Sequence, residues 1–261
     1  MLKLQGLRLK IVLYISMFTI YFSLFTVSYA AHPLITDDTG TQGSGNFQLE
    51  LNSEFSHENE DGTEEDTFEI APVLSYGIAD MVDVVMGVPY QHIHHKENGR
   101  KNTENGVSDI SLEIKWRFYD KDGLSFALKP GITLPTGDND KGLGSGKVTY
   151  STFFITTKEI QPWAFHLNLG HIRNENKSYE RKDLWHASLA AGYAITEKIT
   201  LVSNIGFERN VDRHVNTHPA FVLGGLIYSV SENLDIDCGV KGGLNKPESD
   251  YSVIAGLSLR F

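Results

Sequence analysis

Tyr251-Ser252-Val253-Ile254-Ala255-Gly256-Leu257-Ser258-Leu259-Arg260-Phe261 closes the chain, and its side chains alternate in kind from one residue to the next. One face of such a strand is apolar, carrying Tyr251, Val253, Ala255, Leu257, Leu259 and Phe261. The other face is small or polar, with Ile254 as the exception. A period of two with one apolar face is how a barrel strand separates lipid from a wet interior. The pattern therefore predicts a membrane-spanning strand.

The terminal phenylalanine adds a second indication. Many bacterial outer-membrane proteins resemble this chain in ending on an amphipathic strand with a C-terminal Phe, which the barrel-assembly machinery recognises. The resemblance implies a Gram-negative outer membrane, with its lipid and lipopolysaccharide as partners. Soluble sandwiches also end on strands, so the start of the chain has to help decide.

The first thirty residues have the features of a cleavable signal peptide. Basic residues precede an apolar run over residues 11–27, and the small residues Ser28 and Ala30 stand at both recognition positions of a signal peptidase site. The run is near the lower limit for a spanning helix. Polar residues inside it and the cleavage pattern favour removal over a retained anchor. We therefore expect residues 1–30 to be cleaved and the mature chain to begin at Ala31.

Composition agrees with a barrel. The hydrophobic fraction is 41%, glycines number 24, and no stretch after residue 30 is long and apolar enough for a spanning helix. The formal net charge of −10 becomes more negative once the basic signal is removed, which excludes nucleic acid as a favoured partner. Cys238 is the only cysteine, so no internal disulfide forms.

Alternating segments bounded by turn residues recur through residues 46–261, which we interpret as a single transmembrane antiparallel β-barrel of about twelve strands in an all-β chain. The expected strands are 46–57, 66–78, 82–93, 108–119, 124–134, 147–158, 162–173, 184–195, 199–209, 218–230, 234–242 and 250–261. An even count puts both termini on one side, which in this class is the periplasm. Residues 31–45 are then expected as a periplasmic N-terminal segment.

The connections between these strands alternate in length. Short links are expected at 79–81, 120–123, 196–198 and 231–233, and longer polar loops at 58–65, 94–107, 135–146, 174–183 and 210–217. Short periplasmic turns and long external loops are typical of outer-membrane barrels. A soluble sandwich gives no reason for this alternation.

Charged residues gather on the predicted lumen face. In strand 108–119 every second residue is large and apolar, whereas Glu113, Lys115 and Arg117 fall on the opposite face. A dry core would make such a row costly, but a wet lumen hydrates and pairs it. The candidate lumen-lining residues are Glu69, Asp83, Glu113, Lys115, Arg117, Lys129, His166, His186, Asp235, Asp237 and Lys241. They favour a charged channel that selects solutes by sign, or a pairing network that fills a narrow barrel.

Two irregular stretches fall outside the barrel periodicity: residues 32–46, which begin His32-Pro33-Leu34-Ile35-Thr36-Asp37-Asp38, and the loop with Leu134-Pro135-Thr136-Gly137-Asp138 and Lys141-Gly142-Leu143-Gly144-Ser145-Gly146. Both resemble the family of outer-membrane transporter-like proteins described as meta-pathway phenol degradation proteins, and the likeness runs through the mature chain. The resemblance implies a barrel that admits small, often hydrophobic or aromatic, compounds. It carries over no ligand-contacting residue.

Each irregular stretch leaves two alternatives open. The loop residues Pro135, Thr136, Gly137, Asp138, Lys141 and Gly142 either fold into the barrel mouth as a constriction or form an ordered surface loop. Asp37 and Asp38 either enter the lumen or cap the first strand.

Other candidate sites have plain alternatives. The acidic residues between 58 and 66 are best explained as a solvated loop, because they lack the spacing of a calcium site. His57, His92, His94 and His95 offer imidazole ligands for a transition metal, although exposed histidines are common on loops.

His186, Ser188 and Asn204 are similar to the His, Ser and Asn arrangement of outer-membrane phospholipase A, in which the serine attacks an acyl ester. In that enzyme these residues face the bilayer. Here Trp185, Ala187 and Leu189 occupy the lipid face, so His186 and Ser188 are expected in the lumen, away from an acyl substrate. No cofactor fingerprint is present and no cofactor or metal is expected.

The leading hypothesis from sequence is therefore a passive outer-membrane channel for a small, hydrophobic or aromatic solute. A non-transporting barrel, structural or adhesive, is the alternative, and a phospholipase-type enzyme comes third.

Overall fold

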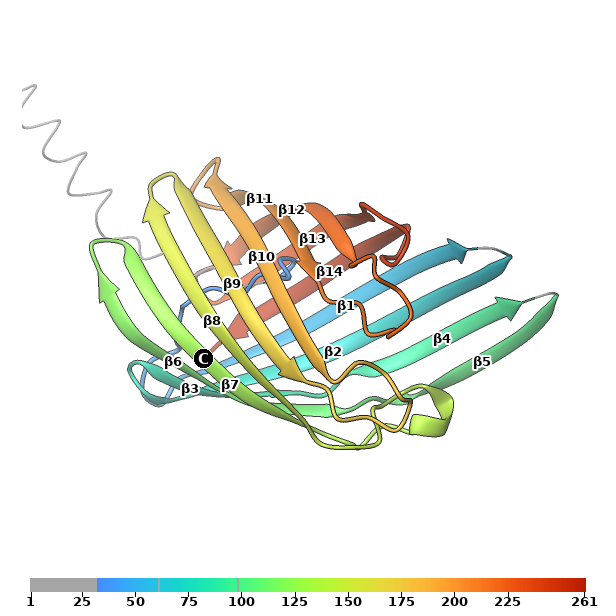
Figure 1. The fold of residues 1–261 in the computed structure, drawn as a ribbon. Helices are drawn as coiled ribbons and strands as arrows, with labels where there is room; N and C mark the ends of the chain where they lie inside the picture. Colours follow the sequence, from blue (N-terminus) through green and yellow to red (C-terminus); the bar gives the residue numbers. More distant parts are fainter. Residues whose placement is uncertain (1–31, 61, 98) are drawn as a thin grey trace, which may run out of the picture.

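The computed structural model describes residues 32–60, 62–97 and 99–261, and the predicted signal peptide lies outside these ranges. The described chain forms one antiparallel sheet that closes on itself, because β1 (Phe47–Glu60) pairs both with β14 (Tyr251–Arg260) and with β2 (Thr63–Ala79). The remaining strands follow in chain order around the wall (Figure 1). They are β3 (Val82–Gly87), β4 (Tyr90–Glu97), β5 (Arg100–Val107), β6 (Ile110–Lys121), β7 (Leu124–Leu134), β8 (Thr149–Ile160), β9 (Trp163–Arg173), β10 (Asp183–Ala194), β11 (Ile199–Glu208), β12 (Ala220–Ser231) and β13 (Leu234–Gly243).

The barrel has twelve wall strands, as predicted, although the structure divides the sheet into fourteen segments. The difference arises at two interruptions. β3 and β4 both pair with β2 and are separated only by Val88 and Pro89, and β5 and β6 are separated by Ser108 and Asp109. Pro89 has no backbone N–H and so breaks the hydrogen-bond ladder of the long strand.

Two predicted loops proved wrong. Residues 58–65 and 94–107 were expected as long external loops, but β1 with β2 and β4 with β5 continue as paired strands through both regions. These extensions project beyond the rest of the barrel in Figure 1. Outside the membrane a strand needs no apolar face, so its polar sequence resembled a loop. The loops between β7 and β8, β9 and β10, and β11 and β12 are long, as predicted.

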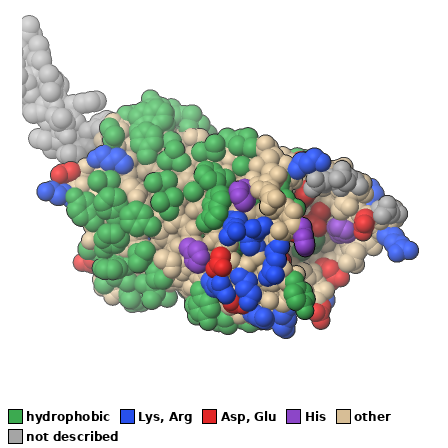
Figure 2. Space-filling view, viewed as in Figure 1, with side chains coloured by type: hydrophobic (Ala, Val, Ile, Leu, Met, Phe, Trp, Pro, Cys, Tyr) green, Lys and Arg blue, Asp and Glu red, His purple; other side chains and the backbone are tan. Residues whose placement is uncertain are grey.

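The outward face of the wall is apolar. Ile114, Trp116 and Leu189 each expose nearly half of their surface, whereas the inward Ser252 and Ser258 are fully buried. Hydrophobic side chains cover the outer surface towards the end with the short turns, and charged residues and histidines gather towards the end with the long loops (Figure 2). The predicted separation into a lipid face and a lumen face is therefore confirmed.

Aromatic side chains form pairs near the strand ends. Trp163 contacts Tyr193 at the short-turn end, with ring centroids 4.7 Å apart. Trp185 packs edge-on against Phe207 near the long loops, at 5.5 Å. At the seam the terminal Phe261 exchanges backbone hydrogen bonds with Phe47. These positions suit the two interfacial girdles of an outer-membrane barrel.

Candidate functional site

Residues 32–46, which we call the plug, lie inside the barrel lumen. They follow the wall from β13 to β2 near the short-turn end, making contacts in the pairs His32–Asp237, Thr36–Ser188, Thr39–Thr157, Gln42–Asp83 and Gly45–Gly77. The described part of the expected N-terminal segment, residues 32–45, thus lies within the barrel. Of the two alternatives for Asp37 and Asp38, the structure shows entry into the lumen. Polar side chains of the wall provide the hydrogen-bond partners that the plug needs there.

Two asparagines of the wall bind the plug backbone. The Asn204 carboxamide oxygen accepts from the N–H groups of Ile35 (2.8 Å) and Thr36 (3.0 Å), and its Nδ2 donates to Thr36 Oγ1 (2.7 Å). Asn168, with its amide oriented to suit, accepts from Asp37 N and donates to Asp37 O. An irregular segment has no strand ladder to satisfy its backbone, so these side chains take the place of one.

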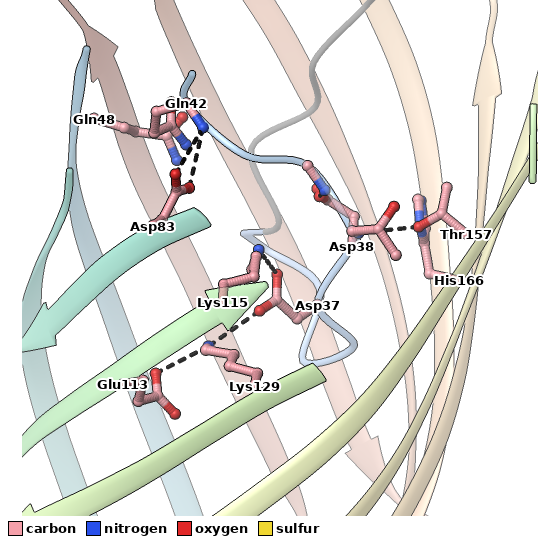
Figure 3. A network of polar contacts seen from close by, with 12 residues as sticks. Asp37, Asp38, Gln42, Gln48, Asp83, Glu113, Lys115, Lys129, Thr157 and His166 are labelled. Atoms are coloured by element: carbon pink, nitrogen blue, oxygen red, sulfur yellow. Dashed lines mark hydrogen bonds and ion pairs between the residues drawn. The ribbon is translucent and has the colours of Figure 1, made fainter. Parts of the chain in front are cut away.

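The centre of the plug is fixed by charge (Figure 3). Asp37 accepts from Lys115 Nζ at 2.8 Å and from Lys129 Nζ at 3.0 Å, and Lys129 also contacts Glu113 at 2.9 Å. All four side chains are mostly shielded from solvent. Burial by itself raises the pKa of the Asp37 carboxyl, but attraction to the two lysines outweighs it and holds this pKa below its usual range. Asp37 therefore stays ionised down to strongly acidic pH.

An apolar contact supports the first residues of the plug. Phe221, Leu223 and Ile254 point into the lumen and form a buried cluster, against which Leu34 packs. Ile254, the one exception in the alternation of the last strand, thus has a reason to face inward. Burying these side chains together stabilises the docked plug through the hydrophobic effect.

Glycines of the wall leave room for Pro33. A Cβ atom on Gly225 would lie 2.9 Å from Pro33 Cγ, and one on Gly239 would lie 3.3 Å from Pro33 Cβ. Larger residues at these lumen positions would push the plug away from the wall.

The plug leaves part of the lumen open. A cavity of about 230 Å³ lies between the plug and the walls formed by β1, β2, β3, β6 and β7. Five carboxylates and two lysines border it: Asp37, Asp38, Glu50, Asp83, Glu113, Lys115 and Lys129. Because the acidic groups outnumber the basic ones, the cavity carries a negative field.

All the candidate lumen residues face inward, but they fall into three groups. Asp83, Glu113, Lys115, Lys129 and Asp237 meet the plug or pair with its partners, and His166 joins them through Thr157. Arg117 and Asp235 lie nearer the short turns, where they pair with Asp120 and Arg260. The rest lie towards the long loops, in the pairs Glu69–Gln91, His186–Ser188 and Lys241–Glu54.

The lipase-like residues also lie in the lumen. His186 Nε2 is 2.9 Å from Ser188 Oγ, and Thr36 Oγ1 of the plug donates to that same oxygen at 2.7 Å. Ser188 is only 3% exposed. The hydroxyl is covered by the plug and directed away from lipid, as the sequence predicted.

The loop after β7 is held at the rim by Asp109. One carboxylate oxygen accepts from Gly137 N at 2.9 Å, and the other accepts from Ser145 N and Ser145 Oγ, both at 2.8 Å. Leu143 is buried beside Gly106, and Asp138 caps the short 3-10 helix η1 (Asn139–Lys141). Among the described residues that line the cavity, none comes from the proposed constriction, Pro135, Thr136, Gly137, Asp138, Lys141 and Gly142.

Replacing Asp109 with alanine is expected to release this loop. Loss of three hydrogen bonds to one carboxylate should lower the free energy of unfolding by about 2–4 kcal/mol, since bonds to charged groups contribute about 1.5–3 kcal/mol each and water replaces some of them. Urea unfolding of the protein in detergent measures the change. Asp138→Ala is the matched control, because loss of its cap should cost only about 1 kcal/mol. Equal effects of the two substitutions would contradict the anchoring role of Asp109.

The uncharged residues that bind the plug were predicted only in part, because Ser188 and Asn204 were noted for a lipase-like arrangement and not as partners of the plug. Asn168 and Thr157 were placed on strands but given no role, and Ser125, whose hydroxyl pairs with Thr39, was not singled out. Asparagine is disfavoured within strands, so Asn168 and Asn204 in the middle of β9 and β11 were an available signal.

The fold and the occupied lumen define the class of an outer-membrane β-barrel with an internal plug. The chain belongs to the family described as "Putative MetA-pathway of phenol degradation", whose model matches residues 32–261. This confirms the family resemblance drawn from the two irregular stretches.

Solved structures show the same fold. The COG4313 outer membrane channel from Pseudomonas putida F1 is similar with a TM-score of 0.71 at 14% identity, over 86% of this chain and 98% of that one. The NanC porin matches with a TM-score of 0.55 at 12% identity, over 81% and 98% of the two chains. The KdgM porin matches with a TM-score of 0.51 at 10% identity, over 82% and 99%. A search of curated proteins finds no match.

Proposed function

We propose that the protein is a passive outer-membrane channel for a small solute, with a lumen narrowed by its own N-terminal plug. The observation that carries the proposal is the cavity of about 230 Å³ that remains between the plug and the wall. A barrel filled entirely by side chains would leave no such space. The family and the channels and porins of similar fold support this function. No energy source, cofactor or catalytic step is part of the proposal.

The cavity favours a small amphipathic solute. Leu34, Ile35, Val73 and Val85 provide apolar contact, while the carboxylates and lysines bind or orient a polar group. A compact ring with one polar substituent meets both requirements, in agreement with the aromatic compounds that the family description suggests. Among ions the excess of carboxylates should favour cations.

The proposed setting follows the usual orientation of these barrels. The short turns and both chain ends face the periplasm, and the long loops face outward. The apolar band contacts the bilayer and the lipopolysaccharide leaflet, and the final strand serves recognition by the assembly machinery.

The test is the reversal potential of single channels under a salt gradient in planar bilayers. The wild-type protein should conduct weakly with a preference for cations. Glu50→Gln should reduce that preference, because Glu50 borders the cavity and, within the described part of the chain, its carboxylate accepts hydrogen bonds from the amides of Gln48 and Asn52 and has no cationic partner. Glu69→Gln is the matched control, since Glu69 faces the lumen but does not line the cavity.

Discrete steps with equal selectivity in both variants would contradict a pathway through this cavity. An inserted barrel that never conducts, with or without its plug, would favour the structural or adhesive alternative.

A further inference from the structure

The projecting part of the sheet carries a row of possible metal ligands on its outer face. β1, β2 and β4 place His57 opposite Asp66 and Asp66 opposite His94. The neighbour of His57 on β14 is Tyr251, which belongs to the outward apolar face of the last strand. Directly opposed residues of paired strands share a face, so the three side chains stand side by side on the outside.

The predicted histidine cluster is therefore divided by the pleat of β4. His94 shares the outer row with His57 and Asp66, and His92 lies one row closer to the apolar band, opposite Phe68. His95 has the opposite orientation and pairs with Glu65 at 3.3 Å. Sequence spacing placed these histidines together, but the pairing of strands decides which of them can share a ligand.

Three donors of this face lie within reach of one ion. A ring nitrogen of His57, a carboxylate oxygen of Asp66 and one of Glu64 all lie within 4.8 Å of one another. His57 Nδ1 already contacts Asp66 Oδ1 at 2.7 Å. All three side chains are only partly exposed, at 22% for His57, 33% for Asp66 and 37% for Glu64. Paired strands fix their backbones, so little rearrangement separates this arrangement from a coordination sphere.

We propose that His57, Asp66 and Glu64 bind a divalent transition-metal cation of the Zn²⁺ and Cu²⁺ class. One imidazole nitrogen with two carboxylates is a donor set that suits these ions, whereas Ca²⁺ and Mg²⁺ prefer oxygen ligands alone. The register places His94 next to Asp66, where a rotamer change away from Thr103 makes it a fourth ligand. Water completes the sphere.

Lys96 supplies the positive charge that the ion would replace. Its ammonium group contacts Glu64 Oε2 at 2.7 Å. A bound dication and this ammonium repel each other, so binding moves Lys96 away from Glu64. The lysine therefore weakens metal binding, and its removal should strengthen it.

The test is Zn²⁺ titration calorimetry and Cu²⁺ electron paramagnetic resonance on the folded mature barrel in detergent. One Zn²⁺ should bind per chain, and His57→Ala and Asp66→Asn should each weaken binding by more than about 10-fold, the loss that even a group outside the first coordination sphere can cause. Lys96→Ala should tighten binding. His92→Ala is the matched control and should leave the affinity unchanged, because His92 lies on the same face outside the cluster.

The Cu²⁺ spectrum separates the two forms of the site. Nitrogen couplings from two imidazoles that fall to one in His94→Ala would identify His94 as a ligand, and coupling from one imidazole that His94→Ala leaves intact would support the three-residue site alone. Zn²⁺ affinity equal in the wild type, His57→Ala and Asp66→Asn would overturn the proposal. Heat-dependent mobility of each variant in denaturing gels checks that the barrel is folded. A barrel that never conducts would still bind the ion, so this result is independent of the channel function.

Discussion

Deletion of residues 32–43 is expected to raise single-channel conductance several-fold. The plug follows the wall from β13 to β2, and its removal would join the volume that it occupies to the cavity beside β1, β2, β3, β6 and β7. Conductance grows with the cross-section of the aqueous path. Without the plug the lumen should be as wide as in a porin, because only the barrel wall bounds it. Residues 44–46, which lead into β1, stay in place because Gly45 and Asn46 form backbone hydrogen bonds with Gly77 of β2. Step amplitudes in planar bilayers give the measurement.

A replacement of the same length provides the control for this deletion. Residues 32–43 exchanged for glycine and serine keep the chain in place but lose the contacts to Asn204, Lys115, Lys129 and Asp237. We expect this variant to show noisy currents between the wild-type and deletion levels, as a tethered chain enters and leaves the lumen. Unchanged step amplitudes in both variants would contradict a plug that limits the pathway.

Replacing Asp37 with alanine is expected to undock the plug without shortening it. Breaking a buried ion pair costs about 3–5 kcal/mol, because the partner charge is left without compensation. Here two lysines lose their shared carboxylate. Lys129 keeps its ion pair with Glu113, whereas Lys115 keeps only the attraction of Asp38 and Asp83 without an ion pair among the described residues. The channel should switch between closed and open levels, and its selectivity should shift towards anions. Single-channel recordings and reversal potentials measure both effects.

Two variants separate docking from simple charge removal. Asp38→Ala removes the same charge one residue away. In the described part of the chain the Asp38 carboxylate accepts a hydrogen bond from the Gly40 backbone and acts on Lys115 without an ion pair, so the plug should stay docked. Adding Lys115→Met to Asp37→Ala should restore part of the closed state, because it removes the ammonium group that has lost its ion pair, while Lys129 keeps its pair with Glu113. Equal switching in the Asp37 and Asp38 variants would refute the anchoring role of Asp37.

Acidification should not imitate the Asp37 substitution. Because the docked pKa of Asp37 is lowered, its ion pairs stabilise docking at all pH values above the ordinary carboxyl range. That stabilisation is lost only as the pH falls through the lowered pKa. Single-channel recordings at pH 7 and pH 5 should therefore show the plug docked for the same fraction of time, insofar as docking depends on the charge of Asp37.

The wall of the barrel could be predicted from the sequence because each strand carries its own period. Lys115 and Trp116 are adjacent in the chain, and the alternation alone assigns Trp116 to the lipid face and Lys115 to the lumen face. The failure at residues 94–107 has the same physical origin. Once a strand leaves the bilayer its two faces are both polar, so His94 and Thr103 can pair across a hairpin without any periodic signal.

The plug could not be predicted from local pattern, because the bonds that hold it to the wall are long-range. Asp37 meets Lys115 and Lys129, and Thr36 meets Asn204, only after the wall has closed. Charged and polar lumen residues were identified correctly as a group, but their partners depend on the strand register. Asp37 and the wall lysines are far apart in the sequence, and no local pattern indicates that they form ion pairs.

The long separation between plug contacts orders the events of assembly. His32 contacts Asp237, which stands 205 residues later in the chain, in β13. We therefore expect the plug to dock late in folding, because its binding surface is complete only when strands far apart in the chain have paired and β14 has met β1. On this expectation the barrel passes through an open form before its own plug narrows the lumen.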